Sequence, residues 1–207
     1  MPGKKTEVIN VLEEQVSNDG AYSIIPPYTV EVTITGDSKI LFHRWSDDDV
    51  AAKAKAAKNS AAKKTDNLEA YVYRDEKGDI AIPGEYLRQS IIRAAKFRQD
   101  PRSKRKSAYD LFKAGITSMT DLASCGTACW DFVDRRRVMI QRNGVTRERP
   151  GLYEGWSASF LFSVLLPEYI DKALLHSVIT DAGRLEGIGD FRPTFGRFQI
   201  VRFEAIN

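Results

Sequence analysis

Apolar and polar side chains alternate most regularly between Tyr28 and Thr35, where Val30, Val32 and Ile34 fall on one side of the chain. This period of two is typical of a half-buried β-strand, because successive side chains of a strand point to opposite faces. The following Gly36-Asp37 ends the pattern, since glycine and aspartate favour turns. Residues 39–45 are expected to continue the sheet as a short second strand.

A hairpin and a helix are predicted in the next patterned stretch. Residues 70–74 and 79–82 have the composition of short strands on either side of Asp75-Glu76-Lys77-Gly78, with the glycine in the turn. The helix follows Pro83-Gly84, because its apolar residues recur on one helical face while its polar residues fall on another. The apolar set is Leu87, Ile91, Ala94 and Ala95, and the polar set is Gln89, Arg93 and Lys96.

The C-terminal half shows the same two periods. Residues 108–123 favour a helix, and the apolar run 156–166 favours a strand that is central in its sheet or covered on both faces. A second helix is expected to begin at Pro167, where the missing N–H costs nothing, and to end at Gly183. The closing strand, residues 197–204, should place on one face Phe198, Ile200 and Arg202.

Without its insertions, this order of elements approximates β-α-β-β-α-β, so we predict an α+β fold with a ferredoxin-like, RRM-like core. The length of 207 residues suits a single domain. Four further segments are expected around that core. They are an N-terminal arm (1–27), a mobile insertion without an apolar stripe (46–67), a helical insertion (98–130) and a basic hairpin (135–150).

The composition favours a protein that binds neither a membrane nor a metal. The sequence contains no apolar run of about eighteen residues and no apolar stretch behind its N-terminal lysines, so we expect a cytoplasmic protein. Its two cysteines, Cys125 and Cys129, have no second pair of cysteines or histidines nearby to complete a four-ligand site. Neither a metal nor another cofactor is expected.

Basic residues gather in three blocks, although the formal net charge is only +3. Such blocks favour a polyanionic partner, because each neutralised phosphate releases counterions. The alternative interpretation is a solvated charged face. The blocks are Lys53, Lys55, Lys58, Lys63 and Lys64; Arg88, Arg93, Lys96, Arg98, Arg102, Lys104, Arg105 and Lys106; and Arg135, Arg136, Arg137, Arg142, Arg147 and Arg149.

The third block coincides with the predicted basic hairpin. Asn143-Gly144 is the strongest short-range hairpin signal, since a type I′ turn needs two residues that tolerate positive φ. Because side chains alternate between two faces, Arg135 and Arg137 should project together with one subset of the other arginines. Arg142 and Arg147 are further candidates for nucleic-acid contacts. In the alternative interpretation, Asp134 and Glu148 pair with these arginines on a soluble edge.

Two motifs resemble those of a known family. Residues 82–93 combine an Ile-Pro-Gly entry to a helix with Arg88 in the first turn and Arg93 near the middle, although Glu85-Tyr86 departs from the small hydroxyl residues usual there. Residues 183–198 are similar to a glycine-rich loop. This loop follows a helix instead of opening one after a strand, which excludes a dinucleotide-binding fingerprint.

Both motifs, in this order, resemble the RAMP superfamily, whose best-known members are RNA-holding backbone subunits of CRISPR effector complexes. The resemblance spans roughly Tyr28 to Glu204 and implies a non-catalytic subunit of antiviral defence. Such a subunit would bind single-stranded RNA or DNA independently of sequence, with RNA favoured. It would self-associate along the strand or assemble with other subunits of a ribonucleoprotein complex. The glycines would allow close backbone approach or positive φ. The basic residues would contact phosphates, and the phenylalanines of the loop would either stack on a base or simply pack. The implied binding residues are Arg88, Arg93, Lys96, Gly187, Gly189, Arg192, Phe195, Gly196 and Arg197.

Two other functions remain open. Some members of the superfamily cut RNA without metal through a histidine near the first strand, where this chain has His43. The sequence identifies no acidic or basic partner beside His43, as general acid–base catalysis would require. Asp47-Asp48-Asp49 lies where a target-cutting aspartate is expected, although consecutive acids also suit a helix N-terminus. The third function is a protein-assembly factor whose basic blocks confer only solubility.

Overall fold

A four-stranded antiparallel sheet forms the centre of the molecule in the computed structural model, which describes residues 25–55, 67–140 and 143–206. Its spatial order is β12-β1-β11-β7. The strands are β1 (Tyr28–Gly36), β7 (Ile116–Ser118), β11 (Ser157–Val164) and β12 (Phe198–Ile206). The alternation predicted for β1 is confirmed, since Val30, Val32 and Ile34 are fully buried. The strand β11 lies between β1 and β7, which confirms its expected central place.

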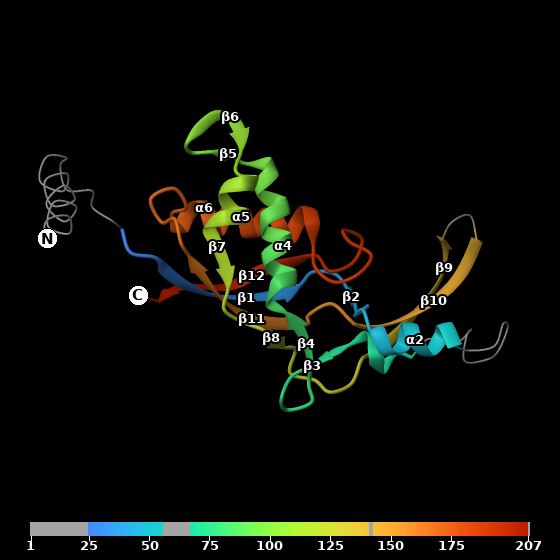
Figure 1. The fold of residues 1–207 in the computed structure, drawn as a ribbon. Helices are drawn as coiled ribbons and strands as arrows, with labels where there is room; N and C mark the ends of the chain where they lie inside the picture. The colour runs from blue at the N-terminus through green and yellow to red at the C-terminus, as the bar shows by residue number, and fades with distance from the viewer. Residues whose placement is uncertain (1–24, 56–66, 141–142, 207) are drawn as a thin grey trace, which may run out of the picture.

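Three helices cover one face of this sheet (Figure 1). They are α4 (Gly84–Ala94), α5 (Tyr109–Gly115) and α6 (Lys172–Asp181). The apolar face predicted for α4 is confirmed, because Leu87, Ile91 and Ala94 are fully buried. Along the chain the central layer runs β1–α4–β7–β11–α6–β12, which is a β-α-β-β-α-β succession. The predicted α+β class is confirmed.

Smaller sheets and turns surround this layer. The long hairpin consists of β9 (Phe132–Ile140) and β10 (Asn143–Leu152), and β2 (Ile40–Leu41) pairs with the base of β10. A second small sheet contains β3 (Tyr73–Arg74), β4 (Ile80–Pro83) and β8 (Leu122–Ser124), and a third contains β5 (Gln99–Asp100) and β6 (Ser103–Ser107). Helical segments outside the layer are α2 (Asp47–Lys55), η1 (Glu69–Tyr71), η2 (Ala95–Phe97) and η3 (Ala182–Glu186).

The strand expected over residues 39–45 forms in part but does not extend the central sheet. Only Ile40–Leu41 is strand, and it pairs with Gly151 and Leu152 of β10. The backbone N–H of Phe42 also donates to the carbonyl of Pro150, at 3.0 Å. This pairing attaches the hairpin to the body of the protein.

The helix predicted over residues 108–123 is too long. The helix α5 ends at Gly115, and the β-branched residues Ile116 and Thr117 then pair with β11 as β7. A side chain on Gly115 would lie 2.6 Å from Ile170, so close packing also explains the glycine. The expected helical insertion over 98–130 is therefore wrong in type, because that range holds more strand than helix and contributes β7 to the central sheet.

The second helix has different ends from those predicted. Asp171 caps its N-terminus by accepting a hydrogen bond from the N–H of Leu174 at 2.7 Å, whereas Pro167 lies in the preceding turn. The π-helical turn η3 continues past Gly183 to Glu186, and Gly187, whose φ is +69°, follows as its C-cap. Gly183 serves packing instead, because a Cβ there would lie 2.0 Å from the carbonyl oxygen of Phe198.

A β-bulge in the closing strand β12 changes which of its side chains face the core. Thr33 pairs with Arg202 but Ile34 pairs with Ile200, so Val201 is the extra residue and is 58% exposed. Phe203, not Arg202, consequently packs against the core with Ile200. The alternation predicted for this strand holds only up to the bulge.

The register of the long hairpin also differs from the prediction. Asn143 pairs with Ile140, so Asn143-Gly144 begins β10 and does not form the turn. The pairing at the base with β2 and Asp131 fixes this register over the local turn preference. The two registers differ by an even number of residues, so Arg135 and Arg137 share one face of the hairpin in both.

Several expected segments extend beyond the described residues. Most of the N-terminal arm (1–27) lies there, as do Arg142 and residues 56–66 of the insertion predicted over 46–67. Within the described part, α2 occupies residues 47–55 of that insertion. None of the described helices has the length and apolar character needed to cross a membrane.

Candidate nucleic-acid interface

The glycine loop, residues 187–197, folds back on itself at its base. The N–H of Ile188 donates to the carbonyl of Gly196 at 2.9 Å, and a Cβ on Gly196 would lie 1.7 Å from the carbonyl oxygen of Ile188. Gly187, Gly189 and Gly196 all have positive φ, at +69°, +80° and +73°. The positive φ expected for these glycines is confirmed, and the close approach that they permit is to the protein's own backbone.

Neighbouring elements hold the glycine loop in place. The N–H groups of Asp190 and Gly196 donate to the carbonyls of Leu41 and Lys39, at 2.9 and 2.8 Å. From the opposite side, the buried hydroxyl of Ser90 on α4 donates to the carbonyl of Gly187 at 2.8 Å. The loop is therefore fixed between β2 and the helix of the Ile-Pro-Gly motif.

One face of the long hairpin packs on the glycine loop. The guanidinium of Arg136 lies over the rings of Phe191 and Phe195, 5.1 and 4.7 Å from their centroids. Arg149 lies 5.6 Å from the Phe191 ring centroid and forms an ion pair with Asp190. Arg136 and Arg149 thus attach the hairpin to the loop, a role that the sequence did not indicate.

The opposite face of the hairpin carries Arg135 and Arg137, both exposed. Arg135 is 72% exposed and lies 3.3 Å from Glu148, its partner in the register. Arg147 pairs with Arg136 in the register and lies on the loop side, half-buried. Arg135 and Arg137 therefore project together, as expected, while Arg147 lies on the other face.

A cavity of about 300 Å³ opens between α4 and the glycine loop. We call it the loop cavity. Its lining residues are His43, Tyr86, Gln89, Arg93, Gly189, Asp190 and Arg192. It brings together Arg93, Gly189 and Arg192, which the sequence motifs had indicated separately.

The charges around the loop cavity act on one another. Burial lowers the pKa of the Arg192 guanidinium, and the positive charge of Arg93 lowers it further. Burial raises the pKa of Tyr86, and its neighbour Tyr73 raises it further, so the Tyr86 phenol stays protonated. The cavity therefore presents two cationic side chains and a neutral hydroxyl.

His43 has an acidic partner that the sequence did not reveal. Its Nδ1 lies 3.5 Å from Oδ2 of Asp190, and its ring meets Tyr71 edge-on with centroids 4.7 Å apart. Burial would raise the pKa of Asp190, but the hydrogen bond from His43 and the charge of Arg149 outweigh it and lower that pKa to about 2. The expectation that His43 stands alone is wrong, because the partner is distant in sequence and meets it only in the fold.

Other residues indicated by the sequence serve local contacts. Arg88 donates through Nε to the carbonyl of Ile116 and through Nη2 to that of Lys113, both at 2.8 Å, which ties α4 to the end of α5. Lys96 donates to Glu186 at 2.6 Å. Neither Arg88 nor Lys96 lines the loop cavity.

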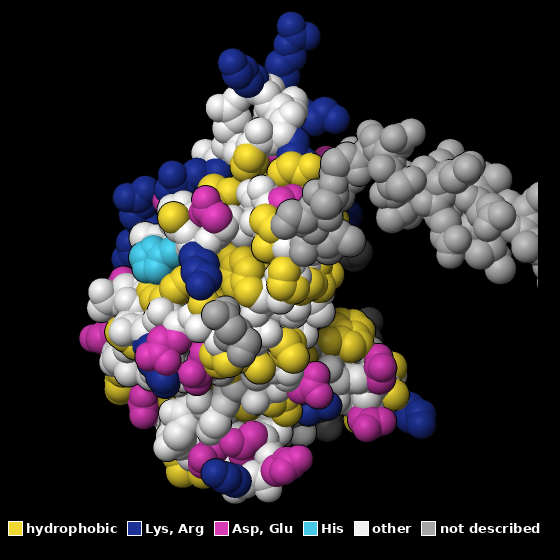
Figure 2. Space-filling view, turned by 90° about the vertical axis from the view of Figure 1, so that its left-hand side faces the viewer, with side chains coloured by type: hydrophobic (Ala, Val, Ile, Leu, Met, Phe, Trp, Pro, Cys, Tyr) yellow, Lys and Arg dark blue, Asp and Glu magenta, His cyan; other side chains and the backbone are white. Residues whose placement is uncertain are grey.

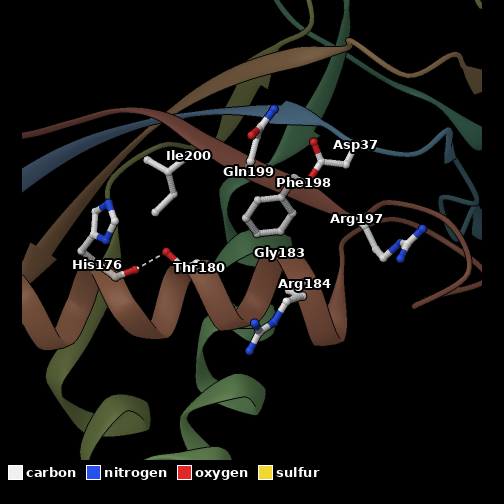
Figure 3. Close-up of a pocket in the computed structure, with 9 residues that line it drawn as sticks. All are labelled: Asp37, His176, Thr180, Gly183, Arg184, Arg197, Phe198, Gln199 and Ile200. Carbon is white, nitrogen blue, oxygen red and sulfur yellow. Dashed lines mark hydrogen bonds between the residues drawn. The ribbon is translucent and has the colours of Figure 1, made fainter.

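Arg197 belongs to a different hollow, of about 460 Å³, between α6 and β12. Figure 3 shows the Phe198 ring facing this space, with Arg184 and Arg197 toward one end and His176 toward the other. The hollow lies along β12, at the edge of the sheet, and shares no lining residue with the loop cavity. Its full lining is Asp37, His176, Thr180, Gly183, Arg184, Arg197, Phe198, Gln199 and Ile200.

The end of the molecule opposite the long hairpin has an apolar centre. Figure 2 shows hydrophobic side chains at the centre of that end, while many of the lysines and arginines lie toward β5 and β6 at the top. Lys104, Arg105 and Lys106 on β6 are exposed, and this small hairpin lies across the molecule from β9 and β10 (Figure 1). The exposed cations of β6 therefore lie apart from those of the long hairpin.

The described residues offer no obvious metal site. They contain no group of three or more His, Cys, Asp or Glu side chains placed to hold a metal ion. Burial raises the pKa of the Cys125 thiol to about 12, so that side chain stays protonated near neutral pH.

The molecule is thus an α+β protein in which a helix-backed antiparallel sheet presents a glycine loop, a cationic cavity and an arginine hairpin. No family model matches the sequence, and no curated protein matches it. Among solved structures, a chain from the cryo-EM structure of the type III-B Cmr-beta bound to cognate target RNA is similar, with a TM-score of 0.53 and 12% identity. The match covers 100% of this chain and 68% of that chain. At this identity, the similarity shows a shared fold.

Proposed function

We propose that this protein is a non-catalytic, RAMP-like backbone subunit that binds single-stranded RNA independently of sequence. The proposal rests on one observation, that the glycine loop, the loop cavity and the long hairpin meet. Asp190 lines the cavity and pairs with Arg149 of the hairpin, which also lies against Phe191 of the loop. Both motifs of the family resemblance contribute to this region. The fold shared with a chain of an RNA-bound complex supports the same function.

The charges of this region favour the phosphate backbone over the bases. Arg135 and Arg137 project from the hairpin, while Arg93 and Arg192 face the loop cavity. Arginine offers phosphate a planar fork of donors, and phosphate contacts carry no sequence information. We infer that RNA contacts both the loop cavity and the exposed face of the hairpin, which points away from the glycine loop. The hairpin, which protrudes from the body (Figure 1), would reach a neighbouring copy or another subunit on the same strand.

Binding of single-stranded RNA is expected to exceed binding of the matching duplex and to fall steeply with salt. Each phosphate neutralised on a single strand contributes about −0.7 to the slope of log K against log[salt]. Titration of a labelled strand and its duplex at several salt concentrations measures both quantities. An affinity that stays flat between low and moderate salt would contradict the proposal.

A second candidate function is metal-independent cleavage of RNA, which the contact between His43 and Asp190 favours. With its Nδ1 held by Asp190, His43 has Nε2 left to accept the proton of a ribose 2′-hydroxyl. The 2′-oxygen would then bond to phosphorus, and the 5′-oxygen would leave and take a proton from water. The products would be a 2′,3′-cyclic phosphate and a 5′-hydroxyl.

Labelled RNA should stay intact with the wild-type protein in the presence of EDTA if the first function is correct. Comparison of the wild type with His43→Ala and with the matched control His176→Ala decides between the two functions. Cleavage that only His43→Ala abolishes would establish the second function and rule out a non-catalytic subunit.

A further inference from the structure

Among its described lining residues, the loop cavity has two arginines and a single carboxylate. Its single carboxylate, Asp190, contacts both Arg149 and His43. The nearby Glu186 accepts a hydrogen bond from Lys96 at 2.6 Å. Within the described residues, neither Arg93 nor Arg192 has an ion-pair partner, and Arg192 makes one long contact, 3.5 Å, to the carbonyl of Gly187.

Like charges are held together in this cavity. Arg93 comes from α4 and Arg192 from the glycine loop, and the loop is anchored to α4 through Ser90. The two guanidinium groups are near enough for the charge of Arg93 to disfavour the charged form of Arg192. An arrangement of this kind costs free energy unless an anion lies between the two groups.

The cavity also offers neutral donors. The Tyr86 phenol lines it and stays protonated, since burial raises its pKa. Gln89 lines it as well, with one Nε2 hydrogen directed to Glu85 at 2.6 Å and a second hydrogen available. Tetrahedral oxyanions have enough oxygens to accept from several donors at once.

The charge of the anion distinguishes two kinds of phosphate. A phosphodiester within a strand carries one negative charge, whereas a phosphomonoester carries between one and two near pH 7, because its second pKa is about 6. Two arginines beside an already paired carboxylate match the more highly charged group. The volume of about 300 Å³ suits one nucleotide end and not a length of strand.

We propose that the loop cavity binds the terminal phosphomonoester of an RNA strand. This inference rests on the proposed RNA-binding function and makes it more specific, because it assigns the exposed hairpin arginines to the continuing strand and the loop cavity to its end. The same chemistry occurs at a 5′-phosphate and at a 3′-phosphate, so the experiment includes both.

The test compares one short RNA with a 5′-phosphate, with a 3′-phosphate and with hydroxyls at both ends. We expect the wild type to prefer one phosphorylated form about fivefold, the effect of a few charge-assisted hydrogen bonds at a partly exposed site. Arg93→Gln/Arg192→Gln should bind the three strands equally, with an affinity below that of the wild type because both arginines belong to the proposed RNA interface. The matched control Arg105→Gln/Arg184→Gln, outside the cavity, should keep the preference.

Equal binding of all three strands by the wild type would overturn the inference and leave the proposed function intact. Failure to bind any strand would instead reject the proposed function.

A thermal shift with a nucleoside monophosphate, compared with the nucleoside, then tests the cavity alone. Stabilisation that Arg93→Gln/Arg192→Gln abolishes supports the inference, and no stabilisation of the wild type rejects it. The single variant Arg93→Gln, which changes an exposed side chain, repeats the comparison if the double variant does not fold.

Discussion

Replacing Arg135, Arg137 and Arg142 together by alanine should weaken binding of single-stranded RNA at least tenfold, about 1.4 kcal/mol per tenfold step. The salt dependence should become shallower, because fewer phosphates are neutralised. Arg135 and Arg137 project from the same face of β9, opposite the face that Arg136 and Arg149 pack on the glycine loop. The fold should survive, since Arg135 is 72% exposed and Arg137 is exposed too.

The matched control removes the same charge elsewhere. Lys104→Ala/Arg105→Ala/Lys106→Ala likewise deletes three cations, which are exposed on a small hairpin across the molecule from β9 and β10 (Figure 1). It should change affinity much less than the first variant, through the net charge alone. If both variants bind RNA equally well, the long hairpin is not part of the interface.

Replacing Arg149 by methionine should lower the free energy of unfolding by about 3 kcal/mol. Arg149 is 7% exposed and forms an ion pair with Asp190. Without Arg149, the contact with His43 is the one side-chain ion-pair contact left to Asp190 among the described residues. Removing one partner of a buried ion pair costs more than removing both, because one charge stays uncompensated. Urea unfolding of Arg149→Met and of Arg149→Met/Asp190→Asn measures this, and the double variant should recover part of the loss.

Arg135→Met is the control for Arg149→Met, because the same substitution at an exposed position should change stability by no more than about 0.5 kcal/mol.

The pH dependence of stability gives a second measure of the pair between Arg149 and Asp190. The pKa of Asp190 is lowered from 3.8 to about 2, so its ionised form contributes stability above about pH 4 that is lost as the pH falls toward 2. Without Arg149 that pKa should rise, and this acid-induced loss should shrink. An unchanged acid profile would contradict the role assigned to the pair.

The sequence by itself determined the elements whose signal is local. The alternation of Val30, Val32 and Ile34 gave β1, and the apolar spacing that includes Leu87 and Ile91 gave α4. The glycines of the loop indicated positive φ, since residues with a Cβ rarely adopt it. The period of a strand also predicted that Arg135 and Arg137 share one face of the hairpin. An even shift of register leaves that face unchanged.

Tertiary structure decided where those elements meet. Residues 116–118 form a strand because β11 offers them a partner, and the bulge at Val201 appears only when β12 pairs with β1. The contacts of Asp190 with His43 and Arg149 join the glycine loop to β10 and to the segment after β2, which are far apart along the chain. Local periodicity cannot specify such contacts, because they depend on how separate elements pack and not on the order of neighbouring residues.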